Sequence, residues 1–171
     1  GQQEIANNLS IDLETLTMPS LVTIVTPSFN SAKTIEATIQ SVLQQTYRPI
    51  EYMVMDGRSK DGTVEIARRY EPVLKVISEP ARGQSDAINK GWRMAQGDIL
   101  AWLNADDQYL PDSVQLAVDY LENHPEVGWV YGSLQSIDPE GRSFPYRNFE
   151  MTWNYSALLQ VGCYVAQPTV F

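Results

Sequence analysis

The chain has 171 residues, 43% of them hydrophobic and 19% charged, and its formal net charge is -9. This composition predicts one folded domain with a sizeable core, and its acidity argues against nucleic acid or an anionic membrane surface as the main partner. Cys163 and His124 are the only cysteine and the only histidine. They exclude a disulfide framework, a cysteine-based metal site and nucleophilic schemes that need a histidine beside serine or cysteine.

The first residues are polar and are expected to lie outside the folded domain. Residues 1–19 carry Ile5, Leu9 and Leu13 at a loose helical spacing, which predicts a helical or frayed leader closed by Pro19. No apolar run approaches the roughly 20 residues that span a bilayer, and the start lacks the features of a signal peptide. We therefore expect a folded domain at 20–171 that is cytoplasmic, either free or peripheral to the inner face of a membrane.

Apolar strands and amphipathic helices alternate from residue 21 to residue 132. Strands are predicted at 21–26, 51–56, 73–78, 98–104 and 127–132. The helices between them have buried faces that begin at Ile35, Val64, Ala87 and Val114. Near-continuous apolar strands separated by such helices predict an α/β fold, with a parallel sheet covered by helices on both faces.

Capping and breaking residues set the expected ends of these helices. Asn30 or Ser31 is expected to cap the first helix, Gly97 to end the third and Pro111 to open the fourth. After residue 132 the alternation weakens. A short helix is expected at 151–160, and the sequence VAQPTVF at 165–171 favours the start of another strand.

The aromatic residues divide into two groups. Trp92, Trp102 and Trp129 fall on predicted buried faces, which favours roles in the core over roles in ligand binding. Trp153 and Tyr155 lie in the irregular segment and are better candidates for contact with a ligand.

The most informative stretch is LAWLNADDQYLP at 100–111, where an apolar strand ends in Asn104, Ala105, Asp106 and Asp107. Open α/β sheets bind ligands at the carboxyl ends of their strands. Two adjacent carboxylates repel each other, and a divalent cation with phosphate oxygens as its other ligands would relieve that repulsion. The alternative is a solvated acidic turn before the next helix.

Polar, small and acidic residues follow four of the predicted strands and should meet at this same edge. They lie at 26–30, 56–63, 79–86 and 104–107. The four carboxylates of Asp56, Asp86, Asp106 and Asp107 exceed what solubility requires, although Asp56 and Asp61 are also ordinary turn formers. Neither a dinucleotide fingerprint nor a P-loop follows the first strand, so a nucleotide would be held in another way.

Two stretches carry a resemblance to a known family. VTPSFNSAKTIEATIQSVLQQTYRPIEYMVMDGRSKDGT and RGQSDAINKGWRMAQGDILAWLNADD resemble, in order and spacing, the nucleotide-binding half of the inverting family 2 glycosyltransferases. The resemblance covers about residues 20–132 and extends less closely to 171. It implies the GT-A fold, a Rossmann-like three-layer sandwich with a mostly parallel central sheet. It also implies transfer of a sugar from a nucleotide sugar with inversion at the anomeric carbon.

The resemblance implies roles for particular residues. Asp56 would accept a hydrogen bond from a uracil ring, and Asp86 would lie close to the nucleotide or the sugar. The residues expected to contact the donor are Thr26, Pro27, Phe29, Asp56, Arg82, Gly83, Asp86, Asn104 and Asp106.

Asn104-Ala105-Asp106 stands where the family has its D-x-D motif. Asp106 is the expected ligand of Mn²⁺ or Mg²⁺, and Asp107 is the second candidate. Asn104 stands where an aspartate is usual, so it can hydrogen-bond a ribose hydroxyl but adds no charge.

The family usually supplies the general base as an acid in a later segment, which is expected here beyond Phe171. Asp138, Glu140 and Glu150 are the only acids after the fifth predicted strand, and nothing marks any of them as the base. The domain is therefore expected to be truncated at its C-terminus.

Three functions compete. The first is a metal-assisted inverting glycosyltransferase that takes a UDP sugar and a saccharide or lipid-linked acceptor. The second is a nucleotide-sugar-binding module without turnover. The third is a flavodoxin-like receiver domain, which is disfavoured because the third predicted strand ends in Ser78 and Glu79 rather than in an aspartate.

Overall fold

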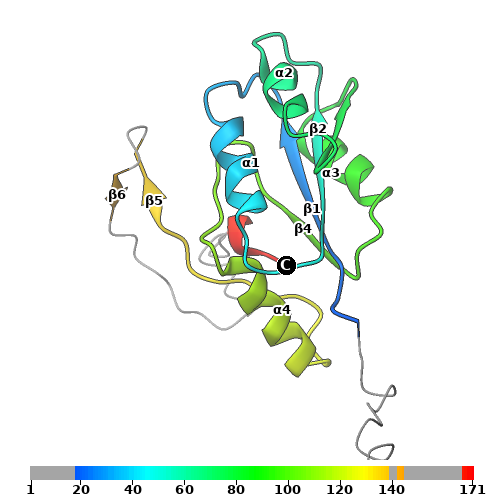
Figure 1. Cartoon of the computed structure of the whole chain (residues 1–171), viewed down its shortest axis with the longest axis vertical. Coiled ribbons are helices and arrows are strands. Elements are labelled where there is room, and N and C mark those ends of the chain that lie inside the picture. The colour runs from blue at the N-terminus through cyan, green and yellow to red at the C-terminus, as the bar shows by residue number, and fades with distance from the viewer. Residues whose placement is uncertain (1–17, 139–141, 145–166) are drawn as a thin grey trace, which may run out of the picture.

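The computed structural model describes residues 18–138, 142–144 and 167–171. Its centre is a four-stranded sheet in the order β3-β2-β1-β4, in which every neighbouring pair is parallel (Figure 1). The strands are β1 (Val22–Ser28), β2 (Ile50–Asp56), β3 (Lys75–Ser78) and β4 (Ile99–Trp102). The predicted parallel α/β fold is thus confirmed.

Helices cover both faces of this sheet, so the fold has three layers (Figure 1). The helices are α1 (Ile35–Leu43), α2 (Thr63–Arg68), α3 (Gln84–Trp92) and α4 (Ser113–Asn123). Side chains alternate along β1: Val22 and Ile24 pack in the large core with α1, α2 and α4, whereas Val25 packs with α3 on the other face. Because successive side chains of a strand point to opposite faces of the sheet, the buried residues divide between two hydrophobic layers.

Helix α3 approaches the sheet closely because its inner face carries small residues. A Cβ atom placed on Gly91 would lie 2.7 Å from Cγ1 of Val25 and 3.2 Å from Cγ of Met55. Ala87, one turn earlier, is also buried. This close packing fixes the start of α3 beside the carboxyl ends of β1 and β2.

The structure corrects two of the predicted strands. No strand forms at 127–132; instead Val130 and Phe171 exchange two backbone hydrogen bonds of 3.0 Å. The sequence QPTVF does not open a strand either, because Gln167–Thr169 forms a short 3-10 helix, η3. Pro168 has no N–H to give to a ladder, which explains this outcome.

Two helix ends also differ from expectation. Helix α1 begins at Ile35 with Thr34 as its N-cap, because residues 31–34 already form a hydrogen-bonded turn. Neither Asn30 nor Ser31 is its N-cap. Helix α3 ends at Trp92, well before Gly97, and the chain continues in turns to β4. Gly97 instead lies against β1, where an added Cβ would be 2.5 Å from Thr23 Oγ1.

A small two-stranded hairpin lies apart from the central sheet. Strands β5 (Ser136–Ile137) and β6 (Ser143–Phe144) form an antiparallel hairpin that projects away from the central sheet in Figure 1. In the described part of the chain, no helix is long and apolar enough to cross a membrane. Residues 1–17 of the predicted leader and the predicted helix at 151–160 lie outside the described residues. So do the single residues Glu140, Glu150, Trp153, Tyr155 and Cys163.

The remaining tryptophans are half-buried rather than fully buried. Trp92, the last residue of α3, and Trp102, the last residue of β4, pack edge to face with ring centroids 5.5 Å apart. Trp129 stacks on Tyr131 at 5.4 Å. Trp92 and Trp102 thus pack against the hydrophobic layer that includes Ala87 of α3, as predicted, whereas the strand predicted to place Trp129 in the core does not form.

Candidate functional site

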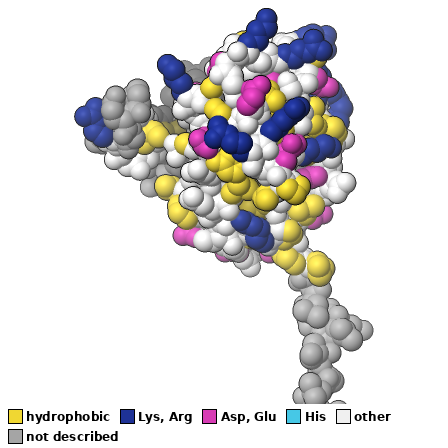
Figure 2. Space-filling view, turned by 45° about the horizontal axis from the view of Figure 1, so that its top comes forward, with side chains coloured by type: hydrophobic (Ala, Val, Ile, Leu, Met, Phe, Trp, Pro, Cys, Tyr) yellow, Lys and Arg dark blue, Asp and Glu magenta, His cyan; other side chains and the backbone are white. Residues whose placement is uncertain are grey.

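A cleft of about 990 Å³ opens at the carboxyl ends of the strands. Its walls come from the loops after β1, β2 and β4 and from the start of α3, which are the segments that the sequence placed at this edge. The residues with predicted roles that line it are Pro27, Phe29, Gly83, Asn104 and Asp106. Figure 2 turns this edge toward the viewer and shows acidic and basic side chains interspersed there with hydrophobic surface.

Phe29 presents an open aromatic ring at the wall of the cleft. It is 65% exposed, although the preceding seven residues of β1 are buried. Gly57 lies directly beside the ring, since an added Cβ there would be 3.3 Å from Phe29 Cδ2. A flat exposed ring of this kind can stack on a planar ligand group.

Asp56 is buried, with 2% of its surface exposed, and lies beneath the cleft rather than in its lining. The sheet register places Ser28, Asp56 and Ser78 side by side on neighbouring strands. The carboxylate accepts hydrogen bonds from Ser28 Oγ at 3.3 Å, Ser78 Oγ at 2.7 Å, the Ser59 amide at 2.9 Å and Ser59 Oγ. These four donors match the four lone-pair positions of a carboxylate.

Thr26 is also beneath the cleft. It has no exposed surface, and its Oγ1 lies 3.0 Å from the Tyr52 hydroxyl in the core. The structure therefore does not bring the Thr26 side chain into the cavity that Pro27 and Phe29 line.

The loops after β1 and β2 hold each other in place. The Asn30 amide donates to Ser59 Oγ at 2.8 Å, and the Lys60 amide donates back to Asn30 Oδ1 at 3.0 Å. Asn30 and Arg58 both adopt left-handed backbone conformations, with φ of 51° and 65°. Each loop thus depends on the other for its shape.

A second pair of contacts continues this connection toward α1 and α2. The Ser31 amide donates to Thr63 Oγ1 at 2.8 Å, and the Ala32 amide donates to Asp61 Oδ2 at 2.9 Å. Hydrogen bonds from Thr63 and then from Ala32 lower the pKa of Asp61, so this exposed carboxylate stays ionised.

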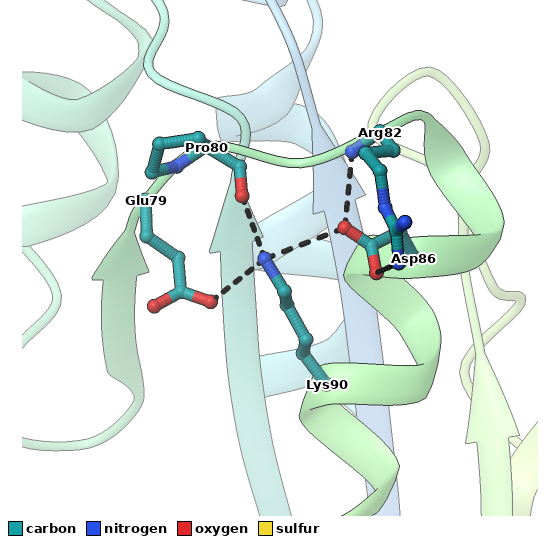
Figure 3. A network of polar contacts seen from close by, with 5 residues as sticks. All are labelled: Glu79, Pro80, Arg82, Asp86 and Lys90. Atoms are coloured by element: carbon teal, nitrogen blue, oxygen red, sulfur yellow. Dashed lines mark hydrogen bonds and ion pairs between the residues drawn. The ribbon is translucent and has the colours of Figure 1, made fainter.

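Asp86 lies at the centre of a polar network beside the cleft (Figure 3). Its Oδ2 accepts the Arg82 amide at 3.0 Å and lies 3.4 Å from Lys90 Nζ. Lys90 also contacts Glu79 Oε1 at 3.0 Å and donates to the Pro80 carbonyl at 2.6 Å. These contacts hold the loop at 79–83, whose residues Ala81 and Gly83 form part of the cleft wall.

The same network shifts two pKa values. The Arg82 amide and then Lys90 lower the pKa of Asp86. Hydrogen bonds to Glu79 and then to Asp86 raise the pKa of Lys90. The Arg82 side chain itself is 93% exposed, and its guanidinium is 4.0 Å from Asp86. Arg82 and Asp86 therefore shape the wall, and neither belongs to the cleft lining.

The turn after β4 carries the two adjacent acids. Asp106 is exposed and lines the cleft, whereas Asp107 is half-buried. Burial raises the pKa of Asp107, Asn104 opposes this shift through a hydrogen bond of 3.0 Å, and Asp106 adds to it by repulsion. Thr38 Oγ1 donates to the Asp107 carbonyl at 2.8 Å and thereby ties the turn to α1.

This pair fits a cation shared with a ligand better than a cation enclosed by protein. The described residues contain no cluster of three or more histidine, cysteine, aspartate or glutamate side chains that could hold a metal ion. Mg²⁺ and Mn²⁺ prefer oxygen donors, and Mg²⁺ is commonly bound through one or two carboxylates together with phosphates and water. Asp106 and Asp107 supply that number of carboxylates.

Some cleft residues lie outside the segments that the sequence placed at this edge. They are Ser31, Lys33, Thr34 and Ala87. Among the described residues that line the cleft, Lys33 is the only one with a basic side chain. The acidic net charge could have pointed to it, because a phosphorylated ligand requires local positive charge.

Asp138, considered above as a general base, belongs to the β5–β6 hairpin. Its Oδ2 lies 2.6 Å from Arg142 Nε, and its Oδ1 accepts the Arg142 amide at 2.8 Å. This pairing gives Asp138 a structural function in the hairpin.

The comparisons with known proteins agree on one family. The model of "Glycosyl transferase family 2" matches residues 23–165. Chondroitin synthase of Escherichia coli is 31% identical over 134 residues, which cover 77% of this chain and 20% of that protein. The UDP-Glc:alpha-D-GlcNAc-diphosphoundecaprenol beta-1,3-glucosyltransferase WfgD of Escherichia coli is 31% identical over 120 residues, which cover 69% of this chain and 47% of that protein.

A solved structure shows the same architecture. The mannosyltransferase PcManGT from Pyrobaculum calidifontis, in complex with GDP-Man and Mn²⁺, has a TM-score of 0.63 and 32% identity, and the match covers 68% of this chain and 36% of that one. The predicted GT-A fold is therefore confirmed. The chain spans less than half the length of each of these three proteins. Because the family model matches most of its residues, the chain belongs to glycosyl transferase family 2.

Proposed function

We propose that this chain forms the donor-binding part of an inverting glycosyltransferase that uses a nucleotide sugar, with UDP as the favoured nucleotide. The observation that carries the proposal is the composition of the cleft. An open aromatic ring, Phe29, lines it together with Asp106, which lies next to Asp107. A nucleoside diphosphate needs both features: a flat surface for its base and a cation site for its phosphates.

The relatives support a nucleotide-sugar donor. WfgD takes UDP-Glc as its donor, and PcManGT was solved with GDP-Man and Mn²⁺. We propose a saccharide or lipid-linked hydroxyl as the acceptor, because WfgD acts on an acceptor attached to diphosphoundecaprenol.

The cleft residues receive distinct roles in this proposal. Phe29 stacks on the base, and Asn104 offers its remaining carbonyl lone pair to a ribose hydroxyl. Asp106 and Asp107 would hold Mn²⁺ or Mg²⁺, which supplies positive charge that stabilises the departing diphosphate. Lys33 adds positive charge at the same cleft.

Asp56 contributes to base binding from below the cleft. Its four acceptor positions are taken by Ser28, Ser59 and Ser78, so a uracil N–H reaches this carboxylate only if it displaces one of these donors. We propose that its main effect is to orient Ser28, which lines the cleft. The general base is proposed to come from a segment outside the described residues.

A second candidate function is nucleotide-sugar binding without turnover. Among the described residues, the acids that line the cleft are Asp61 and Asp106, and the contacts of these two acids favour this second function. Asp61 is engaged by Thr63 and Ala32, and Asp106 is assigned to the cation, so neither is free to take a proton from an acceptor. A panel of UDP sugars separates the two functions: donor consumption supports the transferase, and binding without consumption supports the module.

Calorimetry with UDP and GDP, each with and without Mn²⁺, tests the donor proposal. UDP is expected to bind, and Mn²⁺ is expected to strengthen binding. Asp106→Asn should lose the effect of Mn²⁺, while Asp119→Asn on the exposed face of α4 should keep it. Equal UDP affinity with and without Mn²⁺ contradicts the metal role, tighter binding of GDP contradicts the uridine preference, and binding of neither nucleotide contradicts the whole proposal.

A further inference from the structure

Three separate segments of the chain meet at the side chain of Asn104. Its Oδ1 accepts a hydrogen bond from Nε2 of Gln84, the first residue of α3. Its Nδ2 donates to Asp107 Oδ2 at 3.0 Å and to Gln167 Oε1 at 2.5 Å. Gln167 is 63 residues further along the chain, in η3. Asn104 therefore connects the start of α3, the acidic turn and η3.

The direction of these hydrogen bonds is fixed by groups that can only accept. Gln167 Nε2 donates to the Trp102 carbonyl at 3.3 Å, so its Oε1 must face Asn104. Asp107 is a carboxylate and also accepts. Position 104 must therefore offer an N–H₂ group to both Gln167 and Asp107, and its oxygen remains for Gln84. Asparagine meets these requirements and aspartate does not.

The segment that carries Gln167 is itself firmly attached. The Phe171 ring is buried and stacks on Tyr109 with centroids 5.3 Å apart. The Phe171 backbone exchanges two hydrogen bonds with Val130, and Thr169 Oγ1 is bonded to both backbone groups of Gly132. Because Tyr109 follows the acidic turn by two residues, the segment at 167–171 supports that turn at two points.

We propose that Gln167 is a positioning residue of the donor site, and that it requires asparagine rather than aspartate at position 104. This inference rests on the donor-binding function proposed for the cleft. Gln167 acts through Asn104, which holds the Asp107 carboxylate and the Gln84 side chain at the cleft. The segment at 167–171 is thus part of the donor site, although only the acidic turn, and not Gln167, lines the cavity.

An aspartate at position 104 would oppose this arrangement in two ways. It has no hydrogen to give to Gln167 or to Asp107, so both acceptors lose their partner. Gln167 could turn its amide to compensate only by placing Oε1 against the Trp102 carbonyl, which also accepts. A third carboxylate beside Asp106 and Asp107 would further raise the repulsion in the turn.

The first test observes Asn104 directly, without any nucleotide. In an assigned NMR spectrum of the 171-residue chain, Gln167→Leu should shift the side-chain amide signals of Asn104 and Gln84. The matched control is Gln115→Leu, since Gln115 donates to Asp119 within α4, away from Asn104 in the chain. This control should leave both signals in place. If Gln167→Leu also leaves them in place, the positioning role is wrong.

The second test measures UDP affinity in a double-mutant cycle. Gln167→Leu and Asn104→Asp should each weaken UDP binding by about three- to tenfold. The double variant should bind no more weakly than Asn104→Asp alone, because both changes remove the same contact. Effects that multiply in the double variant would overturn the proposal.

The two tests also separate this inference from the function on which it rests. If the unaltered chain binds neither UDP nor GDP, the donor-binding function fails, whereas the NMR comparison still decides whether Gln167 positions Asn104. If UDP binds and the Asn104 signals do not respond to Gln167→Leu, the function stands and the inference fails.

Discussion

Lys90 reaches back along α3 to Asp86, one turn earlier, and its ammonium lies 3.4 Å from the Asp86 carboxylate. The same ammonium donates to the Pro80 carbonyl in the loop before the helix. A side chain from the second turn of α3 therefore holds the loop that precedes the first turn. Because this loop forms one wall of the cleft, the ion pair contributes to the shape of the site (Figure 3).

Asp86→Asn should destabilise the fold at neutral pH, and the loss should shrink in acid. The pKa of Asp86 is lowered, so its contribution is present above the ordinary value of 3.8 and is lost as the pH falls through the lowered pKa. Lys90, with a raised pKa, contributes until the pH rises through that raised value. Thermal unfolding at pH 7 and at about pH 2 measures the difference. Glu65→Gln, on exposed surface, should show no such dependence, and an equal loss at both pH values would contradict the assignment.

Phe29→Ala should weaken nucleotide binding without a loss of stability. The ring is 65% exposed, so its removal costs little core packing, whereas stacking on a base is worth about 1 to 3 kcal/mol. We expect UDP affinity to fall by about five- to a hundredfold and the melting temperature to stay unchanged. Leu116→Ala removes a similarly exposed side chain, 68% accessible, from α4 and should affect neither quantity. Unchanged UDP affinity in Phe29→Ala would place the base elsewhere.

Asp56→Ala should weaken both the fold and the binding of UDP. It would leave the buried hydroxyl of Ser28 and the more exposed hydroxyl of Ser78 without their acceptor, at a cost of roughly 1 to 3 kcal/mol in the free energy of unfolding. Asp56→Asn keeps part of this network and should be milder on both counts. Urea denaturation and calorimetry at a temperature where the variant is folded measure the two effects. A variant as stable as the parent would show that the serine network contributes nothing.

Gly91→Ala should destabilise the packing of α3 on the sheet. The added Cβ would lie 2.7 Å from Val25 Cγ1 in a tightly packed layer, so α3 or β1 must shift. Such overpacking typically costs about 1 to 3 kcal/mol. Gly128→Ala is the control, since an added Cβ there meets nothing within 4 Å. Comparison of the two by urea denaturation checks this, and equal stability would show that the layer can relax.

The sequence predicted most of the central sheet because β1 and β2 are long, continuous apolar strands with helical periodicity between them. It failed at residues 127–132, where the apolar pattern resembles a strand but Val130 exchanges its backbone hydrogen bonds with Phe171. That partner comes from a remote segment, and no local pattern records such a pairing. The GT-A fold was predicted from the resemblance to a known family, and each stretch that carries this resemblance is continuous in the chain.

The candidate site also divides into residues that local patterns predicted and contacts that depend on remote segments. Phe29, Asn104 and Asp106 line the cleft, and the sequence placed them at this edge because they follow predicted strands. Gln167 was missed, since its contact with Asn104 depends on how 63 intervening residues fold. The burial of Asp56 was missed for a related reason: its serine partners come from neighbouring strands, and only the sheet register brings them together.

The loops after β1 and β2 are joined by hydrogen bonds such as the one from the Asn30 amide to Ser59, and both groups in each of these bonds belong to the protein. Folding has therefore already removed most of the conformational entropy of these segments. A nucleoside that enters beside Phe29 meets a surface that needs little further ordering, so less of its interaction energy is lost to rigidifying the protein. Because their amides are hydrogen-bonded within the protein, the same loops should exchange their amide hydrogens slowly even in the free protein. Slow exchange would indicate that this side of the cleft is preorganised before a ligand binds.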